Sequence, residues 1–167
     1  MNKTIKVHFH RKFYSWWNPI KYTTSIIKLF SNDIFYHVSF QIEGTIYSQK
    51  KIYESDCKNG VGKYANPRAD VAYTVPLKIN EQAYNKIVND YNLMVGSKYD
   101  FFGVLFGFFG YKIHNARKYF CSELFLPILK HAYGITKKDL RTNLSPKDVR
   151  MICLGLIVKN TYSKTAF

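Results

Sequence analysis

Hydrophobic and polar residues alternate along several short segments in the first half of the chain. This alternation predicts β-strands at residues 5–10, 34–42, 45–53 and 71–77. Glu43-Gly44 separates the two middle strands, so a short hairpin is expected there, with glycine providing the unusual turn geometry. The polar stretch 54–70 contains two glycines and a proline and is therefore expected to form a loop.

Helical patterns dominate the second half of the chain. Asn80 is a suitable N-cap for a helix that runs to about Met94. Ser145 is a second N-cap, and Pro146 follows it at the first helical position. Other helical or turn-rich segments are predicted at residues 20–30, 99–110 and 121–132, and a closing apolar strand is predicted at 153–158.

The order of these elements indicates an α+β fold in which a mainly antiparallel sheet packs against helices. The 167 residues are expected to form one domain, spanning residues 1–167, because no linker divides them. Residues 160–167 lack periodicity and are predicted to form a loose tail.

The net charge is +14, from 25 Lys and Arg against 11 Asp and Glu. Such a field attracts anionic partners, for example a bacterial wall polymer, a membrane surface or the interior of a virion. The positive residues are spread along the chain in short pairs, and no specific nucleic-acid-binding motif is recognisable. An anionic polymer or a virion component is therefore one class of partner that the composition leaves open.

The longest apolar run, residues 101–111, is about half the length that a helix needs to cross a bilayer. It predicts a buried helix or an interfacial segment, and no transmembrane span is expected. The N-terminus lacks the apolar core and the small-residue cleavage site of a signal peptide. Synthesis in a reducing cytoplasm is therefore expected.

The three cysteines are Cys57, Cys121 and Cys153, and they form neither a CxxC pair nor a ligand cluster with the five histidines. No zinc site, other cofactor or disulfide framework is predicted. Cys121 stands where a basic segment gives way to a helical pattern. A helix start favours a thiolate, because unpaired N–H groups and the positive end of the dipole lie there. A cysteine that only packs in the core is the competing interpretation.

His37, on the second predicted strand, is the candidate base for such a thiol. A tight hairpin places Ile42 opposite Thr45, which makes Ser48 a diagonal neighbour of His37. The Ser48 hydroxyl can then orient the imidazole, with Gln49 as the alternative if the register shifts by one. A half-buried sheet histidine without a chemical role is the competing interpretation.

For three further polar residues, the sequence predicts a structural role and not a catalytic one. His8 and His10 alternate on the first strand, and a partly exposed edge strand is their simplest interpretation. Glu123 lies two residues after Cys121 and is expected to point away from the thiol and to stabilise the start of the helix.

Four segments occur in an order that resembles a known family. They are Tyr36-His37-Val38-Ser39-Phe40, Gly96-Ser97-Lys98-Tyr99-Asp100-Phe101-Phe102-Gly103, Phe120-Cys121-Ser122-Glu123-Leu124 and Leu144-Ser145-Pro146-Lys147-Asp148. Across about residues 5–157, the chain resembles the YiiX-like branch of the permuted NlpC-type, papain-like cysteine peptidases. Cysteine ordinarily precedes histidine in this superfamily, and the circularly permuted members reverse that order, as here.

The resemblance implies a papain-like, circularly permuted NlpC-type fold with Cys121 as nucleophile and His37 as general base. It also implies that Tyr99 approaches the cysteine and helps to form the oxyanion site, although a core anchor is an alternative role for this tyrosine. Relatives often carry Glu, His, Asn or Gln at the third catalytic position. This sequence offers Ser48 there, and a hydroxyl orients imidazole less strongly than a carboxylate does.

The leading hypothesis is a cysteine hydrolase or acyltransferase that acts on an amide or ester bond in a peptide, a wall polymer or a lipid. The alternative is a catalytically weak or inactive viral structural or binding protein that holds an anionic partner through its charge. Members of the family occur in bacteria and their phages, and the Lys-, Asn-, Ile- and Tyr-rich composition resembles AT-rich phage proteins. A virion or an infected bacterial cell is therefore an expected location.

Overall fold

The computed structural model describes residues 2–11, 35–43, 51–67, 70–100, 118–140 and 144–162. Five strands form one sheet in the order β4-β3-β2-β1-β5, and every neighbouring pair is antiparallel. The strands are β1 (Asn2–His10), β2 (His37–Ile42), β3 (Lys51–Asp56), β4 (Gly60–Tyr64) and β5 (Val71–Asn80). The helical elements are α2 (Glu81–Met94), η1 (Cys121–Phe125), α4 (Leu126–Tyr133), η2 (Lys137–Asp139) and α5 (Pro146–Tyr162). The structure confirms the α+β class.

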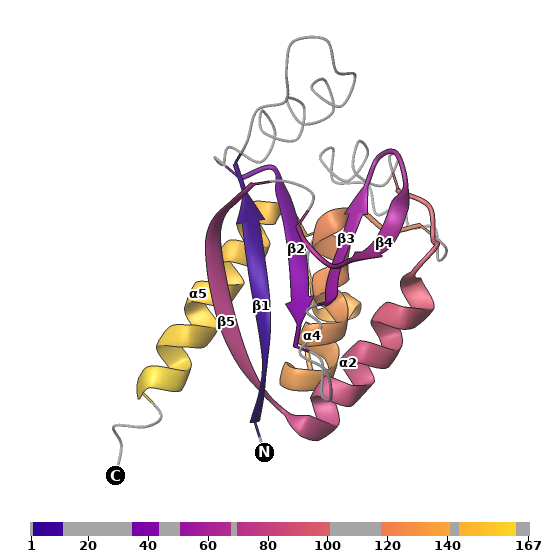
Figure 1. Cartoon of the computed structure of the whole chain (residues 1–167). Coiled ribbons are helices and arrows are strands. Elements are labelled where there is room, and N and C mark those ends of the chain that lie inside the picture. The colour runs from indigo at the N-terminus through magenta and orange to yellow at the C-terminus, as the bar shows by residue number, and fades with distance from the viewer. Residues whose placement is uncertain are drawn as a thin grey trace.

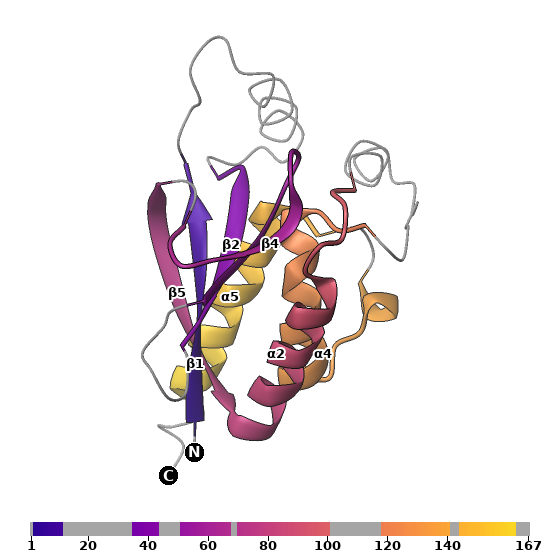
Figure 2. The same cartoon turned by 45° about the vertical axis from the view of Figure 1, so that its right-hand side comes forward.

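The helices α2, α4 and α5 lie on one face of the sheet, as Figures 1 and 2 show from two directions. Alternate residues of β1, namely Ile5, Val7 and Phe9, are fully buried in the core because successive side chains of a strand point to opposite faces. His8 and His10 occupy the intervening positions and are buried as well. The prediction of a partly exposed edge strand was wrong, since β1 pairs with β2 on one side and with β5 on the other.

The segment that was predicted to be a loop completes β3 and forms β4. Asp56 Oδ1 accepts hydrogen bonds from the backbone N–H groups of Lys58 (2.8 Å) and Asn59 (2.9 Å), which closes a tight turn. Gly60 follows with a φ of +70°, and a Cβ at this position would collide with the backbone of Ser97. Glycine therefore permits both the turn and the close approach of β4 to the segment after α2.

The register between β2 and β3 differs from that of the tight hairpin. Ile42 pairs with Lys51 and not with Thr45. Residues 44–50 of the connection lie outside the described part of the chain. Alternation predicts which residues share a face of a sheet, but the register also depends on the connection, and a two-residue turn was the wrong assumption.

The predicted closing strand at residues 153–158 is instead part of α5. Val149 and Cys153 are fully buried about one helical turn apart. Periodicity alone does not separate a short apolar strand from a buried helical segment. Because α5 continues to Tyr162, the beginning of the predicted loose tail is helical.

The start of α5 agrees with the prediction. Ser145 Oγ donates a hydrogen bond to the Asp148 carboxylate at 2.7 Å and accepts one from the Asp148 backbone N–H at 3.2 Å. The Ser145 N–H donates to the same carboxylate at 2.8 Å, so the two residues cap the helix reciprocally.

The other helical predictions divide into two groups. The helix predicted at residues 121–132 is present, as the 3₁₀ segment η1 followed by α4. Residues 20–30, 101–110 and 163–167 lie outside the described residues. Within the described ranges, no helix is long and apolar enough to cross a membrane.

Asn80 caps α2, since its side-chain oxygen accepts the backbone N–H of Ala83 at 2.8 Å. Replacing it by alanine leaves that N–H without its partner, so Asn80→Ala is expected to lower the free energy of unfolding by about 1 kcal/mol. Urea denaturation measures the change. Asn80→Asp keeps an acceptor at the cap and serves as the control; an equal loss in both variants would contradict the capping role.

Candidate active site

Cys121 is the first residue of η1 and is almost completely buried. Two side-chain hydrogen bonds hold the backbone on either side of it. Ser122 Oγ donates to the carbonyl oxygen of Leu144 at 2.6 Å, and Ser55 Oγ on β3 donates to that of Tyr119 at 2.6 Å. The position of the thiol is therefore fixed by contacts to the sheet and to the segment before α5.

Glu123 accepts the backbone N–H of Phe120 at 3.4 Å, so it contacts the start of the helical segment as predicted. The α-helix itself begins only at Leu126, after the 3₁₀ residues of η1. A short 3₁₀ segment has poorer hydrogen-bond alignment than an α-helix and contributes little macrodipole. Stabilisation of a thiolate at Cys121 therefore depends mainly on neighbouring side chains and less on the helix start that the sequence pattern indicated.

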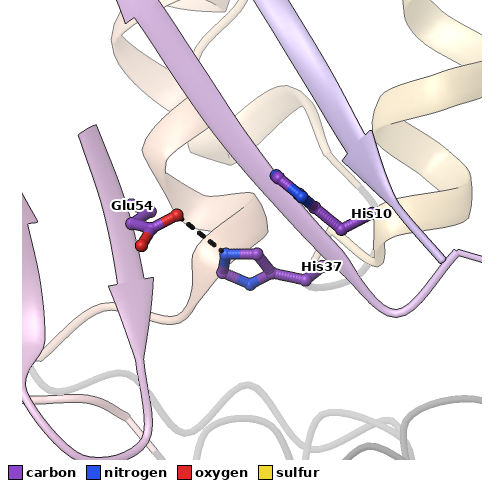
Figure 3. Close-up of side chains that lie close together, drawn as sticks. All are labelled: His10, His37 and Glu54. Atoms are coloured by element: carbon purple, nitrogen blue, oxygen red, sulfur yellow. Dashed lines mark ion pairs between the residues drawn. The ribbon is translucent and has the colours of Figure 1, made fainter. Parts of the chain in front are cut away.

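His37 and Glu54 form a polar pair beside that thiol. His37 Nε2 lies 3.6 Å from Glu54 Oε2, and 14% of the His37 side chain and 2% of the Glu54 side chain are exposed. Figure 3 shows the imidazole of β2 turned toward the carboxylate of β3. Phe40 pairs with Tyr53, so Glu54 is a diagonal neighbour of His37 on the adjacent strand.

Glu54 thus occupies the position relative to His37 that the tight-hairpin register would have given to Ser48. Ser48 and its alternative Gln49 lie outside the described residues. Glu54 was not predicted as a site residue, because the polar stretch 54–70 predicts a loop that begins at this position. The signal that could have identified Glu54 is its acidic side chain, which becomes a diagonal neighbour of His37 when the connection between the two strands is longer than a two-residue turn.

The electrostatic surroundings of His37 show that Cys121 is its other neighbour. Burial by itself would lower the pKa of this imidazole. The charge of the Cys121 thiolate and a hydrogen bond to it act in the opposite direction, together with the hydrogen bond and charge of Glu54, and raise the pKa of His37 to about 10. His37 is therefore an imidazolium at neutral pH, with Cys121 and Glu54 as its neighbours.

His10 lies behind this pair, with its ring centroid 5.1 Å from that of His37. Its Nδ1 is 3.2 Å from the carbonyl oxygen of Asp70, and its Nε2 is 2.9 Å from Ser39 Oγ. Because a carbonyl only accepts hydrogen bonds, the Nδ1 of a neutral His10 carries the proton, and Nε2 accepts the Ser39 hydroxyl. This position of His10 beside the candidate base was not predicted from the sequence.

His8, two residues earlier on β1, is held by a separate set of contacts. Its Nε2 is 3.0 Å from Gln41 Oε1 and its Nδ1 is 2.8 Å from Thr74 Oγ1. Burial lowers the pKa of His8, and the hydrogen bond to Gln41 only partly opposes this effect. His8 is therefore a neutral structural histidine.

Tyr99 lies close to the candidate nucleophile, as the family resemblance implies. Its segment runs beside that of Cys121, because the Tyr119 N–H donates to the Lys98 carbonyl at 3.0 Å. Burial, the charges of Cys121 and Cys57, and a hydrogen bond to Cys57 raise the pKa of Tyr99 well above its ordinary value. The phenol therefore keeps its proton at neutral pH and is available as a hydrogen-bond donor.

The other two cysteines have different surroundings. Cys57 is exposed in the turn between β3 and β4. Cys153 is fully buried in α5, and burial raises the pKa of its thiol to about 12. Among the described residues, it is Cys121 that is placed beside a histidine that is itself paired with a carboxylate.

The geometry also allows a metal-binding role. One ligand atom each from His10, His37 and Glu54 lies within 4.8 Å of the other two, the only such group among the described residues. Comparison with known proteins adds no assignment: no protein-family model matches the chain, and no curated protein matches it.

Removal of the Cys121 charge should change the titration of His37. In chelator-treated Cys121→Ala, burial is opposed only by Glu54, so the pKa of His37 is expected to fall clearly below the value of about 10 in the unsubstituted protein. Heteronuclear NMR of the imidazole nitrogens measures it. Cys153→Ala, which removes a distant buried thiol, is the control, and an unchanged His37 titration in Cys121→Ala would contradict the contact.

Proposed function

We propose that this protein is a cysteine hydrolase or acyltransferase with a papain-like, circularly permuted NlpC-type fold. The observation that carries the proposal is the convergence of Cys121, His37 and Glu54 from η1, β2 and β3. A nucleophile beside a base, with the base held by a third polar group, is the arrangement that thiol catalysis needs. The order of histidine before cysteine supports the permuted version of the fold.

The proposed first step is attack of the Cys121 thiolate on an amide or ester carbonyl. Because His37 Nε2 faces Glu54, Nδ1 is the ring nitrogen left to exchange a proton with the thiol. The Glu54 carboxylate stabilises the imidazolium and holds the ring in this orientation. Attack forms a C–S bond and moves an electron pair onto the carbonyl oxygen.

Collapse of that intermediate requires a proton for the leaving group, and the His37 imidazolium supplies it. The acyl group then remains on the Cys121 sulfur as a thioester. Water or another acceptor, deprotonated by neutral His37, attacks the thioester and releases the thiol. Transfer to water gives a hydrolase, and transfer to another nucleophile gives an acyltransferase.

Tyr99 is the proposed donor to the carbonyl oxygen during both attacks. Its phenol is protonated at neutral pH and lies near Cys121. The hydroxyl contacts the Cys57 thiol in this structure, so it has to turn from Cys57 toward the oxyanion. A protonated donor near the developing negative charge stabilises the transition state more than the ground state.

Glu54 supplies the third polar group of the proposed site, for which the tight-hairpin register had suggested Ser48. A buried carboxylate orients and stabilises an imidazolium more strongly than a hydroxyl does. The resemblance implies wall-peptide amides or lipid acyl groups as substrates, and the positive charge of the chain favours an anionic one. A phage protein that acts in an infected bacterial cell fits this substrate class.

Alkylation with iodoacetamide tests the proposed nucleophile without a substrate. An ordinary thiol is about 1% ionised near pH 6.5, whereas a thiolate paired with His37 reacts there. At that pH Cys121 is expected to react much faster than Cys57, and His37→Ala is expected to slow it by about a hundredfold. Peptide mass spectrometry measures the rate at each cysteine.

Cys57 and Cys153 are internal controls for exposure and burial in the same sample. His131→Ala is the matched variant, since His131 pairs with Asp90 at 2.8 Å and does not belong to the site. If Cys121 reacts no faster than Cys57, the enzyme proposal fails. The binding or structural role with an anionic partner then becomes the better account of the fold.

A further inference from the structure

His10, His37 and Glu54 come from the three adjacent strands β1, β2 and β3 and surround one small region (Figure 3). Their nearest ligand atoms all lie within 4.8 Å of one another. Two imidazoles and a carboxylate are a common donor set for Zn²⁺. Ligands bound at about 2.0–2.2 Å stand at most roughly 4 Å apart, so side-chain movements of about 1 Å would bring the three together.

The hydrogen bonds of His10 place the proton on one ring nitrogen and leave the other, Nε2, with the lone pair that a metal ion requires. Its Nδ1–H donates to the carbonyl of Asp70 at 3.2 Å, and such a bond to the far nitrogen is the usual support of a metal-bound histidine. It leaves the lone pair on Nε2, which now accepts the Ser39 hydroxyl at 2.9 Å. That hydroxyl rotates about a single bond and can release Nε2 without movement of the backbone.

Access and charge are also suitable for a cation. His10 and Glu54 are buried, but 14% of the His37 side chain is exposed, which gives an ion a path to the cluster. The Glu54 carboxylate is the anionic ligand of the cluster, and Cys121 lies beside His37. The ligands lie on three strands far apart in sequence, so a search for closely spaced ligand motifs does not detect them.

We propose that His10, His37 and Glu54 form a binding site for one Zn²⁺ ion. The ligand atoms are Nε2 of His10, Nε2 of His37 and a carboxylate oxygen of Glu54. Zinc takes the place of the proton on His37 Nε2, and that proton is released to solvent.

This metal site does not depend on the proposed thiol chemistry. Zinc uptake is measured by competition with a chromogenic chelator on metal-free protein. We expect one ion per chain, and His10→Phe, which keeps a ring against His37 but removes a ligand, should weaken uptake about tenfold or more. His10→Gln is the second variant if His10→Phe does not fold, as judged by thermal denaturation.

Two results would overturn the proposal. Zinc uptake that is as tight in the His10 variants as in the unsubstituted protein would place the ion elsewhere, and loss of zinc uptake in Cys121→Ser would place it on the Cys121–His37 pair. Failure of the proposed function is distinguishable from either result, because that function is tested by alkylation of Cys121 in metal-free protein and not by zinc uptake.

Discussion

The contact between His37 and Glu54 depends on the register of β2 against β3, and the candidate site depends on that contact. Lys51 lies opposite Ile42, so Glu54 comes within 3.6 Å of the imidazole. A shift by one residue would turn every side chain of β3 to the other face of the sheet. It would bring Tyr53 out of the core and leave the buried carboxylate without its histidine.

Because His37 and Glu54 are both largely buried, their contact affects the stability of the fold and the protonation of the imidazole. Taking a carboxylate out of water is costly, and a neighbouring cation offsets the cost only when the geometry is good. Cys121 lies beside the same imidazole and, together with Glu54, raises its pKa. His37 is therefore held protonated between Glu54 and Cys121, which is the state needed to stabilise a thiolate and to return a proton to a leaving group.

Local signals in the sequence predicted several elements correctly, and non-local pairing explains the failures. The alternation in residues 5–10, the cap at Asn80 and the cap at Ser145 act over a few residues and agree with the structure. Helix or strand identity at residues 153–158 required knowledge of packing, because a short apolar run fits both. Glu54 was missed for a similar reason, since only the strand register shows that it faces His37.

Substitution of Glu54 tests the central claim most directly, because Glu54→Gln preserves shape and removes only the charge. The ultraviolet absorbance of the thiolate, measured against Cys121→Ser at neutral pH, reports the ionisation that His37 supports. We predict that Glu54→Gln diminishes this signal, while Glu43→Gln, which changes an exposed carboxylate paired with Lys6, leaves it unchanged. An undiminished thiolate signal in Glu54→Gln would contradict the account.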